Sequence, residues 1–176
     1  AAQYTAKCMR SSKAIGMMNL DTVGRLGAGK LLVLGAESAA EWTHIARGAG
    51  HVAGVELAVV KEPLDSSDQV SFHEAGVPAI QLFTGPNLDY HRPSDTVEKI
   101  DPDGLVTVAR AAREIVAYLA GRETPLEARL EGSPRAAREK GGERRVSLGT
   151  IPDFTVAGER YRISGVVPGS PADKCG

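Results

Sequence analysis

Four short apolar runs, separated by segments of helical character, constrain the fold of this chain more than any other feature of its sequence. They occupy residues 15–20, 30–35, 55–60 and 77–83. Each run is bounded by glycine or polar residues, which is typical of a buried strand. Since the runs alternate with helical segments, the sequence predicts a layered α/β sheet.

The most regular helical pattern follows the last of these runs, at residues 101–121. Asp101 is suited to cap the helix, Pro102 fits its first turn, and Gly121 is suited to end it. Apolar residues recur at helical spacing and predict one buried face. That face comprises Leu105, Val108, Ala112, Ile115, Val116 and Leu119.

Two shorter helices are expected between the strands. Ser38 can cap a helix that runs to about Ala49, because a serine hydroxyl accepts hydrogen bonds from the first free backbone N–H groups. Ser67 is placed to cap a second helix at residues 68–75, and Gly76 is suited to end it.

Composition and charge exclude several classes of partner. The chain has 176 residues and a formal net charge of −1, which argues against a nucleic acid or a membrane surface as partner. No apolar run approaches the roughly 18 residues that a membrane span requires, so we expect no transmembrane segment in this chain. Residues 1–14 contain no recognisable signal peptide, and the chain does not begin with Met, which suggests a segment of a longer protein.

Side chains suited to metal binding follow three of the expected strands. Asp21 follows the first strand, Asp68 lies in the loop after the third, and His91 follows the fourth. Ligands of open α/β sheets bind beyond the carboxyl ends of strands. Carboxylate oxygen and imidazole nitrogen are good zinc ligands. Asp95 could accept the second ring N–H of His91 and fix the ring orientation.

The residues alone leave two interpretations of His91 open. In one it is a metal ligand, and in the other it is a turn residue ahead of the next helix. A zinc site needs three or four ligands, and the two candidates above do not complete one. We interpret His44, His51 and His73 as structural or solvated side chains, so they do not supply the missing ligands.

Three motifs carry a resemblance to a known family. Residues 18–25 read MNLDTVGR, residues 67–79 read SDQVSFHEAGVPA, and residues 90–96 read YHRPSDT. They resemble the "NLDMVGR", "SDHxxFxxxGIPA" and "YHTxxDT" segments of the di-zinc aminopeptidases, family 28 of the metallopeptidases. The motifs occur in the order and spacing of that family, across residues 15–121.

The resemblance implies a fold, an activity and a role for each site residue. It implies part of a mixed-sheet α/β/α zinc-peptidase domain that hydrolyses N-terminal bonds of peptides or proteins through a metal-bound water. A complete site of the family holds two zinc ions. By resemblance, Asp21 is a ligand of one zinc ion and His91 is a ligand of the other. Asp68, Asp95 and Tyr90 are then side chains that support the ligands or contact the substrate.

The chain also departs from the family pattern. The family's His-x-Asp ligand motif, its bridging Asp and its Glu-Glu pair are expected upstream of Asp21, and none is found there. We therefore expect residues 1–121 to be the C-terminal part of the peptidase domain, without the general-base Glu and inactive alone. Gln69 also stands where many relatives have His. A non-catalytic scaffold and a related di-metal hydrolase or cyclase remain alternatives.

The remaining residues divide into two expected parts. Residues 122–145 are rich in charge and predict an exposed linker. Residues 146–176 resemble the start of a bacterial-type PDZ domain, on the segments SLGTIPDF (147–154) and ISGVVPGSPA (163–172). That resemblance implies capture of a peptide C-terminus by strand addition, and export to the periplasm or beyond. An unrelated β-rich extension is the alternative.

Overall fold

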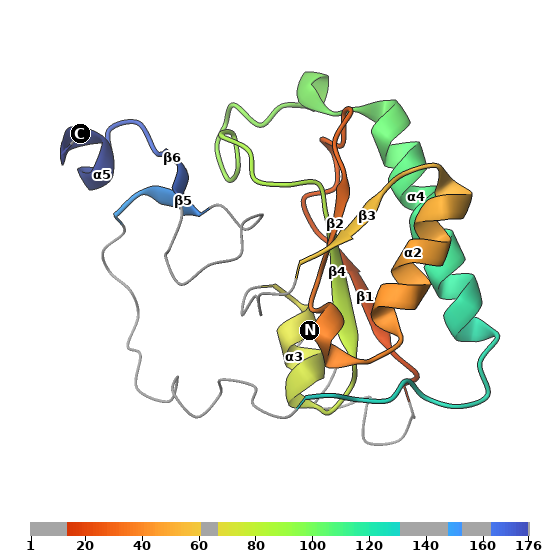
Figure 1. Ribbon diagram of the computed structural model, residues 1–176. Helices are drawn as coiled ribbons and strands as arrows, with labels where there is room; N and C mark the ends of the chain where they lie inside the picture. Colours follow the sequence, from red (N-terminus) through yellow and green to blue (C-terminus); the bar gives the residue numbers. More distant parts are fainter. Residues whose placement is uncertain (1–13, 61–66, 131–147, 153–162, 176) are drawn as a thin grey trace.

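The computed structural model describes residues 14–60, 67–130, 148–152 and 163–175 (Figure 1). Each of the four apolar runs contains a strand, as predicted. In chain order the elements are β1 (Met17–Leu20), β2 (Leu31–Leu34), η1 (Ala36–Ser38), α2 (Trp42–Ala53), β3 (Leu57–Val59), α3 (Gln69–Glu74), β4 (Ala79–Phe83), η2 (Val97–Lys99), α4 (Pro102–Ala120), β5 (Thr150–Pro152), β6 (Ile163–Val166) and α5 (Pro171–Cys175).

The first four strands form one mixed sheet, which confirms the predicted fold class. Their order in the sheet is β1-β4-β2-β3. Strand β4 is parallel to β1 and antiparallel to β2, and β2 is parallel to β3. The carboxyl ends of β1 and β4 therefore lie side by side at one end of the strands, and the carboxyl end of β3 lies at the opposite end.

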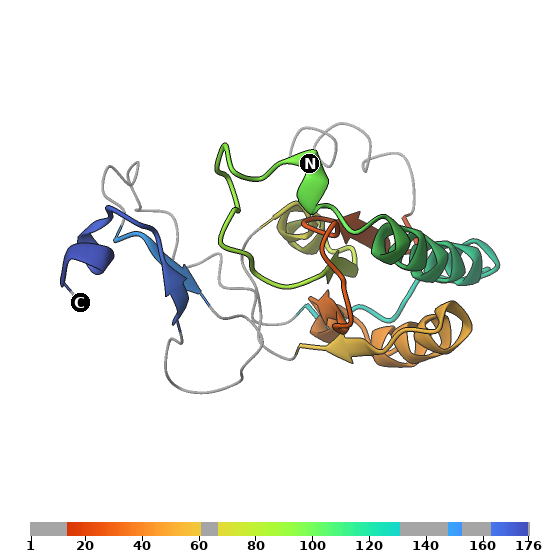
Figure 2. The ribbon, with the colours of Figure 1, turned by 90° about the horizontal axis from the view of Figure 1, so that it is seen from above.

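Helices α2 and α4 pack together on one face of the sheet (Figures 1 and 2). Alternate side chains of the central strands point to that face, as the pleat of a strand requires. Leu31 and Val33 of β2 and Ile80 and Leu82 of β4 are all fully buried there. The other face carries a smaller apolar cluster of Leu32, Leu34, Val60 and Phe83.

Helix α4 matches the sequence prediction in its bounds and its cap. The Asp101 carboxylate accepts a hydrogen bond from the Gly104 backbone N–H at 2.9 Å, and Pro102 is the first helical residue. Val108, Ala112 and Ile115 are buried, but Val116 is 52% exposed. Ala111, which lies outside the predicted face, is fully buried, so the buried face is turned around the helix relative to the prediction.

Ser38 does not cap helix α2, contrary to the sequence prediction. It is the last residue of the 3₁₀ helix η1, and α2 begins at Trp42 with Glu41 as its N-cap residue. The buried Ser38 hydroxyl accepts hydrogen bonds from the Trp42 indole Nε1 at 3.1 Å and from the Ala79 backbone N–H at 3.1 Å. Ser38 thus joins elements that are distant in sequence and does not cap a helix.

The segment 122–130 packs on the sheet domain, whereas the sequence predicted an exposed linker from Arg122. Leu126 is 4% exposed within the main core, and its N–H donates to the Ile15 carbonyl at 3.2 Å. Arg122 forms an ion pair with Glu41 at 3.1 Å. Leu126 and these polar contacts together hold the segment against the sheet domain, as does the hydrogen bond from the Arg129 N–H to the Ser38 carbonyl at 2.8 Å. The linker residues 131–145 lie outside the described residues.

Near the C-terminus, β5 and β6 form an antiparallel pair, followed by the short helix α5. Gly169 adopts a left-handed φ of 79° in the turn before α5. Residues 146–147 and 153–162 of the expected PDZ-like part lie outside the described residues. Within the described ranges, no helix has the length and apolar character that crossing a membrane demands.

Candidate metal centre

The segments that carry Asp21 and His91 follow the carboxyl ends of the neighbouring strands β1 and β4. Beyond the ends of β1 and β4, the Asp21 N–H donates to the Leu82 carbonyl at 3.4 Å and the Thr84 N–H donates to the Thr22 carbonyl at 3.2 Å. The pairing of the two strands thus continues into their loops. The sequence predicted a ligand site beyond the carboxyl ends of the strands from Asp21, His91 and Asp68.

The Asp21 carboxylate is held in place through both of its oxygens. Its Oδ2 accepts a hydrogen bond from the Ser67 hydroxyl at 2.7 Å, and its Oδ1 accepts one from the Thr22 hydroxyl at 3.1 Å. Asn19 Nδ2 in turn donates to Ser67 Oγ at 2.9 Å. A carboxylate oxygen can accept more than one bond, so these contacts orient the group and each oxygen keeps a lone pair with which it can bind a metal ion.

Backbone strain concentrates at the predicted site residues. Among the described residues, the non-glycine positions with positive φ are Thr22 (54°), Ser67 (93°) and His91 (57°). Thr22 follows Asp21 and Ser67 precedes Asp68. Such conformations cost free energy and cluster at functional sites, where the surrounding structure maintains them. The strain therefore marks the same three places that the motifs indicate.

His91 lies exposed in the loop between β4 and η2 and stacks on the neighbouring Tyr90. The two ring centroids are 3.9 Å apart and the ring planes differ by 17°. His91 lies within a tight turn in which the Arg92 N–H donates to the Asp89 carbonyl at 2.9 Å, and a second turn follows in which the Asp95 N–H donates to the Arg92 carbonyl at 3.0 Å. The stacked Tyr90 limits rotation of the imidazole.

The carboxylates that flank His91 bind cations in the structure. Asp95, expected to orient His91, forms an ion pair with Arg25 Nη2. Arg25 Nη1 binds Asp89 at 2.9 Å, and Lys99 Nζ binds the second oxygen of Asp89 at 2.6 Å. Arg25 belongs to the first motif, and no sequence pattern places it beside the His91 loop.

These contacts shift the acid–base properties of the cluster. The Lys99 ammonium, the Ser94 hydroxyl and the Arg25 guanidinium hold the pKa of Asp89 well below its ordinary value. The Asp95 and Asp89 carboxylates raise the pKa of Arg25. Asp89 and Arg25 thus both remain charged at neutral pH.

Asp68 lies at the start of α3, next to the Ser67 that binds Asp21. It is exposed and is the N-cap residue of α3, although its side chain forms no capping hydrogen bond. The following Gln69 is fully buried, with Oε1 3.5 Å from Asn19 Nδ2. Ser67 therefore supports Asp21 where the sequence predicted a helix cap, and Gln69 contributes to the same hydrogen-bonded group.

The described residues fit zinc in their chemistry but do not complete a zinc site. Asp21 and His91 offer a carboxylate oxygen and an imidazole nitrogen, both of which zinc accepts. Yet the described part of the chain contains no group of three His, Cys, Asp or Glu side chains that could hold a metal ion. Any zinc site that uses Asp21 and His91 therefore requires further ligands from outside the described residues.

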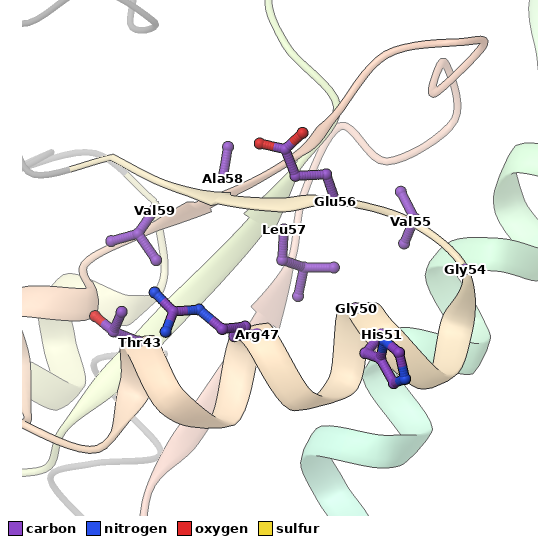
Figure 3. A pocket seen from close by; sticks show the side chains of 10 residues that line it. All are labelled: Thr43, Arg47, Gly50, His51, Gly54, Val55, Glu56, Leu57, Ala58 and Val59. Atoms are coloured by element: carbon purple, nitrogen blue, oxygen red, sulfur yellow. The ribbon is translucent and has the colours of Figure 1, made fainter.

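A surface hollow lies apart from this cluster. It has a volume of about 730 Å³ and lies between the outer edge of β3 and helix α2 (Figure 3). Its walls include Arg47, His51 and Glu56, and none of the predicted site residues. A second hollow of about 680 Å³ adjoins the start of α4 and likewise contains none of them. We therefore base the site on the side-chain cluster.

Comparison with known proteins identifies the family. Residues 1–116 match the family described as Peptidase family M28, and the chain belongs to this family. An aminopeptidase from Aneurinibacillus sp. strain AM-1 is 30% identical, with a TM-score of 0.56 over 73% of this chain and 31% of that one. BSAP, a zinc aminopeptidase from Bacillus subtilis, is 24% identical, with a TM-score of 0.57 over 66% of this chain and 31% of that one.

The likeness to BSAP supports the fold alone, because the identity is low. The chain spans about a third of the length of these two solved structures, at 31% of each. A search of curated proteins found no match.

Proposed function

We propose that the protein containing this chain is a zinc metallopeptidase of the aminopeptidase type, which hydrolyses N-terminal bonds of peptides or proteins. The observation that carries the proposal is the backbone pairing of Asp21 and Thr22 with Leu82 and Thr84 beyond the ends of β1 and β4, because the loop to His91 begins at Thr84. This pairing falls within the region that matches peptidase family M28.

In this proposal Asp21 is a ligand of one zinc ion and His91 is a ligand of a second. Zinc, when bound, polarises the peptide carbonyl and lowers the pKa of a coordinated water to about 7. Ser67 and Thr22 keep the Asp21 carboxylate in one orientation through their hydrogen bonds. Tyr90 keeps the His91 ring in one plane by stacking. Asp68, exposed at the start of α3, contacts the amino group of a substrate in this proposal.

The rest of the site is proposed to come from residues that precede this chain in the full-length protein. These residues supply the other zinc ligands and a glutamate that acts as general base. The chain alone is then inactive. If the preceding residues lack a ligand motif and a Glu-Glu pair, the non-catalytic scaffold becomes the favoured function.

The zinc content of a His91→Ala variant tests the proposal. In the full-length protein we expect the variant to hold one zinc equivalent fewer than the wild type by elemental analysis. His44→Ala is the matched control, because His44 is an exposed histidine on α2. Unchanged zinc content in His91→Ala, or an equal loss in the control, would contradict the assignment.

We further propose that residues 146–176 begin a PDZ-like module, and that the protein is exported. The antiparallel β5–β6 pair and the glycine turn before α5 support the first part. Such a module binds a peptide C-terminus at a sheet edge. Binding of peptides with a free C-terminal carboxylate, but not of their amides, to the full-length protein tests the module. Cell fractionation tests the export, and recovery from the cytoplasm alone would refute it.

A further inference from the structure

We propose that Arg25 is a positioning residue that holds the His91 loop in the conformation in which His91 binds metal. The inference rests on the proposed function, because it takes His91 to be a zinc ligand. The structural reason is that Arg25 binds the loop on both sides of His91.

The guanidinium of Arg25 bridges two carboxylates that bracket His91 in the sequence. Nη1 binds Asp89, two residues before His91, at 2.9 Å, and Nη2 binds Asp95, four residues after it. The planar fork of arginine can bind two acceptors at once, whereas the ammonium of lysine is a single point charge. The bridge closes the stretch of chain that contains His91 into a small loop.

The backbone of Arg25 is itself bound to the residues that follow the ends of β1 and β4. The Arg25 N–H donates to Thr84 Oγ1 at 3.4 Å, and Thr84 Oγ1 donates to the Thr22 carbonyl at 2.7 Å. The Arg25 side chain is 25% exposed and that of Asp89 is 18% exposed, so the pair is partly shielded from water. Arg25 therefore links the segment after Asp21 with the loop of His91, the two proposed ligand segments.

His91 needs such a restraint. It is exposed and has a left-handed φ of 57°, a conformation that most non-glycine residues leave when they are free to do so. Its stacking partner Tyr90 is itself 51% exposed and belongs to the same loop, so Tyr90 cannot fix the loop relative to the sheet. Lys99 assists from the far side by binding Asp89 at 2.6 Å.

The test uses the full-length zinc-loaded protein and measures zinc retention against a chelator. For Arg25→Met we expect zinc affinity at the His91 site to fall by roughly 10- to 100-fold, the usual effect of removing a residue that supports a ligand. Arg25→Lys should lie between wild type and Arg25→Met, because it can keep one of the two contacts. In cobalt-loaded protein, the visible absorption bands of the metal should change in Arg25→Met.

Arg113→Met is the matched control, since Arg113 is exposed on α4 and binds only its neighbour Glu114 among the contacts of the described residues. Asp95→Asn provides a second route should Arg25→Met fail to fold. The double variant Arg25→Met/Asp95→Asn should lose no more affinity than the worse single variant, because both remove the same bridge.

Wild-type zinc affinity and an unchanged cobalt spectrum in Arg25→Met would overturn the inference, as would additive losses in the double variant. The proposed function fails by a different result, which is normal zinc content in His91→Ala. Zinc loss in His91→Ala together with normal zinc affinity in Arg25→Met would therefore refute only the role of Arg25.

Discussion

We expect Ser38→Ala, which removes one buried hydroxyl, to lower the stability of the sheet domain strongly. Ser38 is 1% exposed, and Trp42 and Ala79 beside it are fully buried. The Ser38 hydroxyl accepts hydrogen bonds from the Trp42 indole and the Ala79 N–H, both at 3.1 Å, and lies 2.7 Å from the Gly35 carbonyl, to which it donates. The alanine variant leaves two buried donors without a partner.

A buried donor left unsatisfied costs about 1–3 kcal/mol, so two donors cost about 2–6 kcal/mol. Part of this is recovered because the hydroxyl itself no longer has to be desolvated. We therefore expect Ser38→Ala to lower the free energy of unfolding by about 2–4 kcal/mol. The residue ties η1 and α2 to the start of β4, the strand that leads to the His91 loop.

Urea unfolding of the full-length protein, followed by far-ultraviolet circular dichroism, measures this effect. A double-mutant cycle with Trp42→Phe isolates the indole contact, because Phe has no donor to leave unsatisfied. Ser38→Ala should cost about 1–3 kcal/mol less in the Trp42→Phe background than in the wild type. A loss below about 0.5 kcal/mol, or an equal cost in both backgrounds, would refute the role of Ser38.

Three other predictions follow from the structure. Leu126→Ala should destabilise the protein by about 2–5 kcal/mol in urea unfolding, because Leu126 is 4% exposed, whereas Leu148→Ala at a 68% exposed position should have little effect; equal effects would contradict the packing of residues 122–130. The pKa of Asp101 is lowered by the backbone N–H groups of Gly104 and Gly27, so its contribution is present above the unfolded pKa and is lost as the pH falls through the folded pKa. The melting temperatures of wild type and Asp101→Asn should accordingly differ most near neutral pH and converge in acid, and a constant difference would count against this. The 176-residue chain alone, supplied with zinc, should not turn over an aminoacyl-nitroanilide, and a chelator-sensitive rate would show that it needs no further residues.

Local sequence patterns predicted the elements that local physics determines. The strands follow from apolar runs bounded by glycine or polar residues, and α4 follows from its cap, its first-turn proline and its terminal glycine. The burial of Ala111 and the exposure of Val116 on α4 could not be predicted, because they depend on how the helix packs on the rest of the protein. Leu126 was assigned to a linker because its neighbours are charged, and only the position of the core shows that it is buried.

The site could be predicted only in part for the same reason. Asp21 and His91 were found from motifs, and the parallel pairing of β1 with β4 brings together the strand ends from which their loops begin. The contacts that support them join residues far apart in sequence, such as Ser67 with Asp21 and Arg25 with Asp95. Ser67 resembles a helix cap in its local sequence, and Arg25 resembles a surface cation. No local pattern distinguishes these roles.

The most direct test of the central claim is the anomalous scattering of zinc in crystals of the full-length protein. We expect two zinc peaks. One should lie at roughly 2.0–2.2 Å from a carboxylate oxygen of Asp21, and the other at roughly 2.0–2.1 Å from a ring nitrogen of His91. Zinc peaks that neither Asp21 nor His91 coordinates would contradict the assignment of these two residues as zinc ligands.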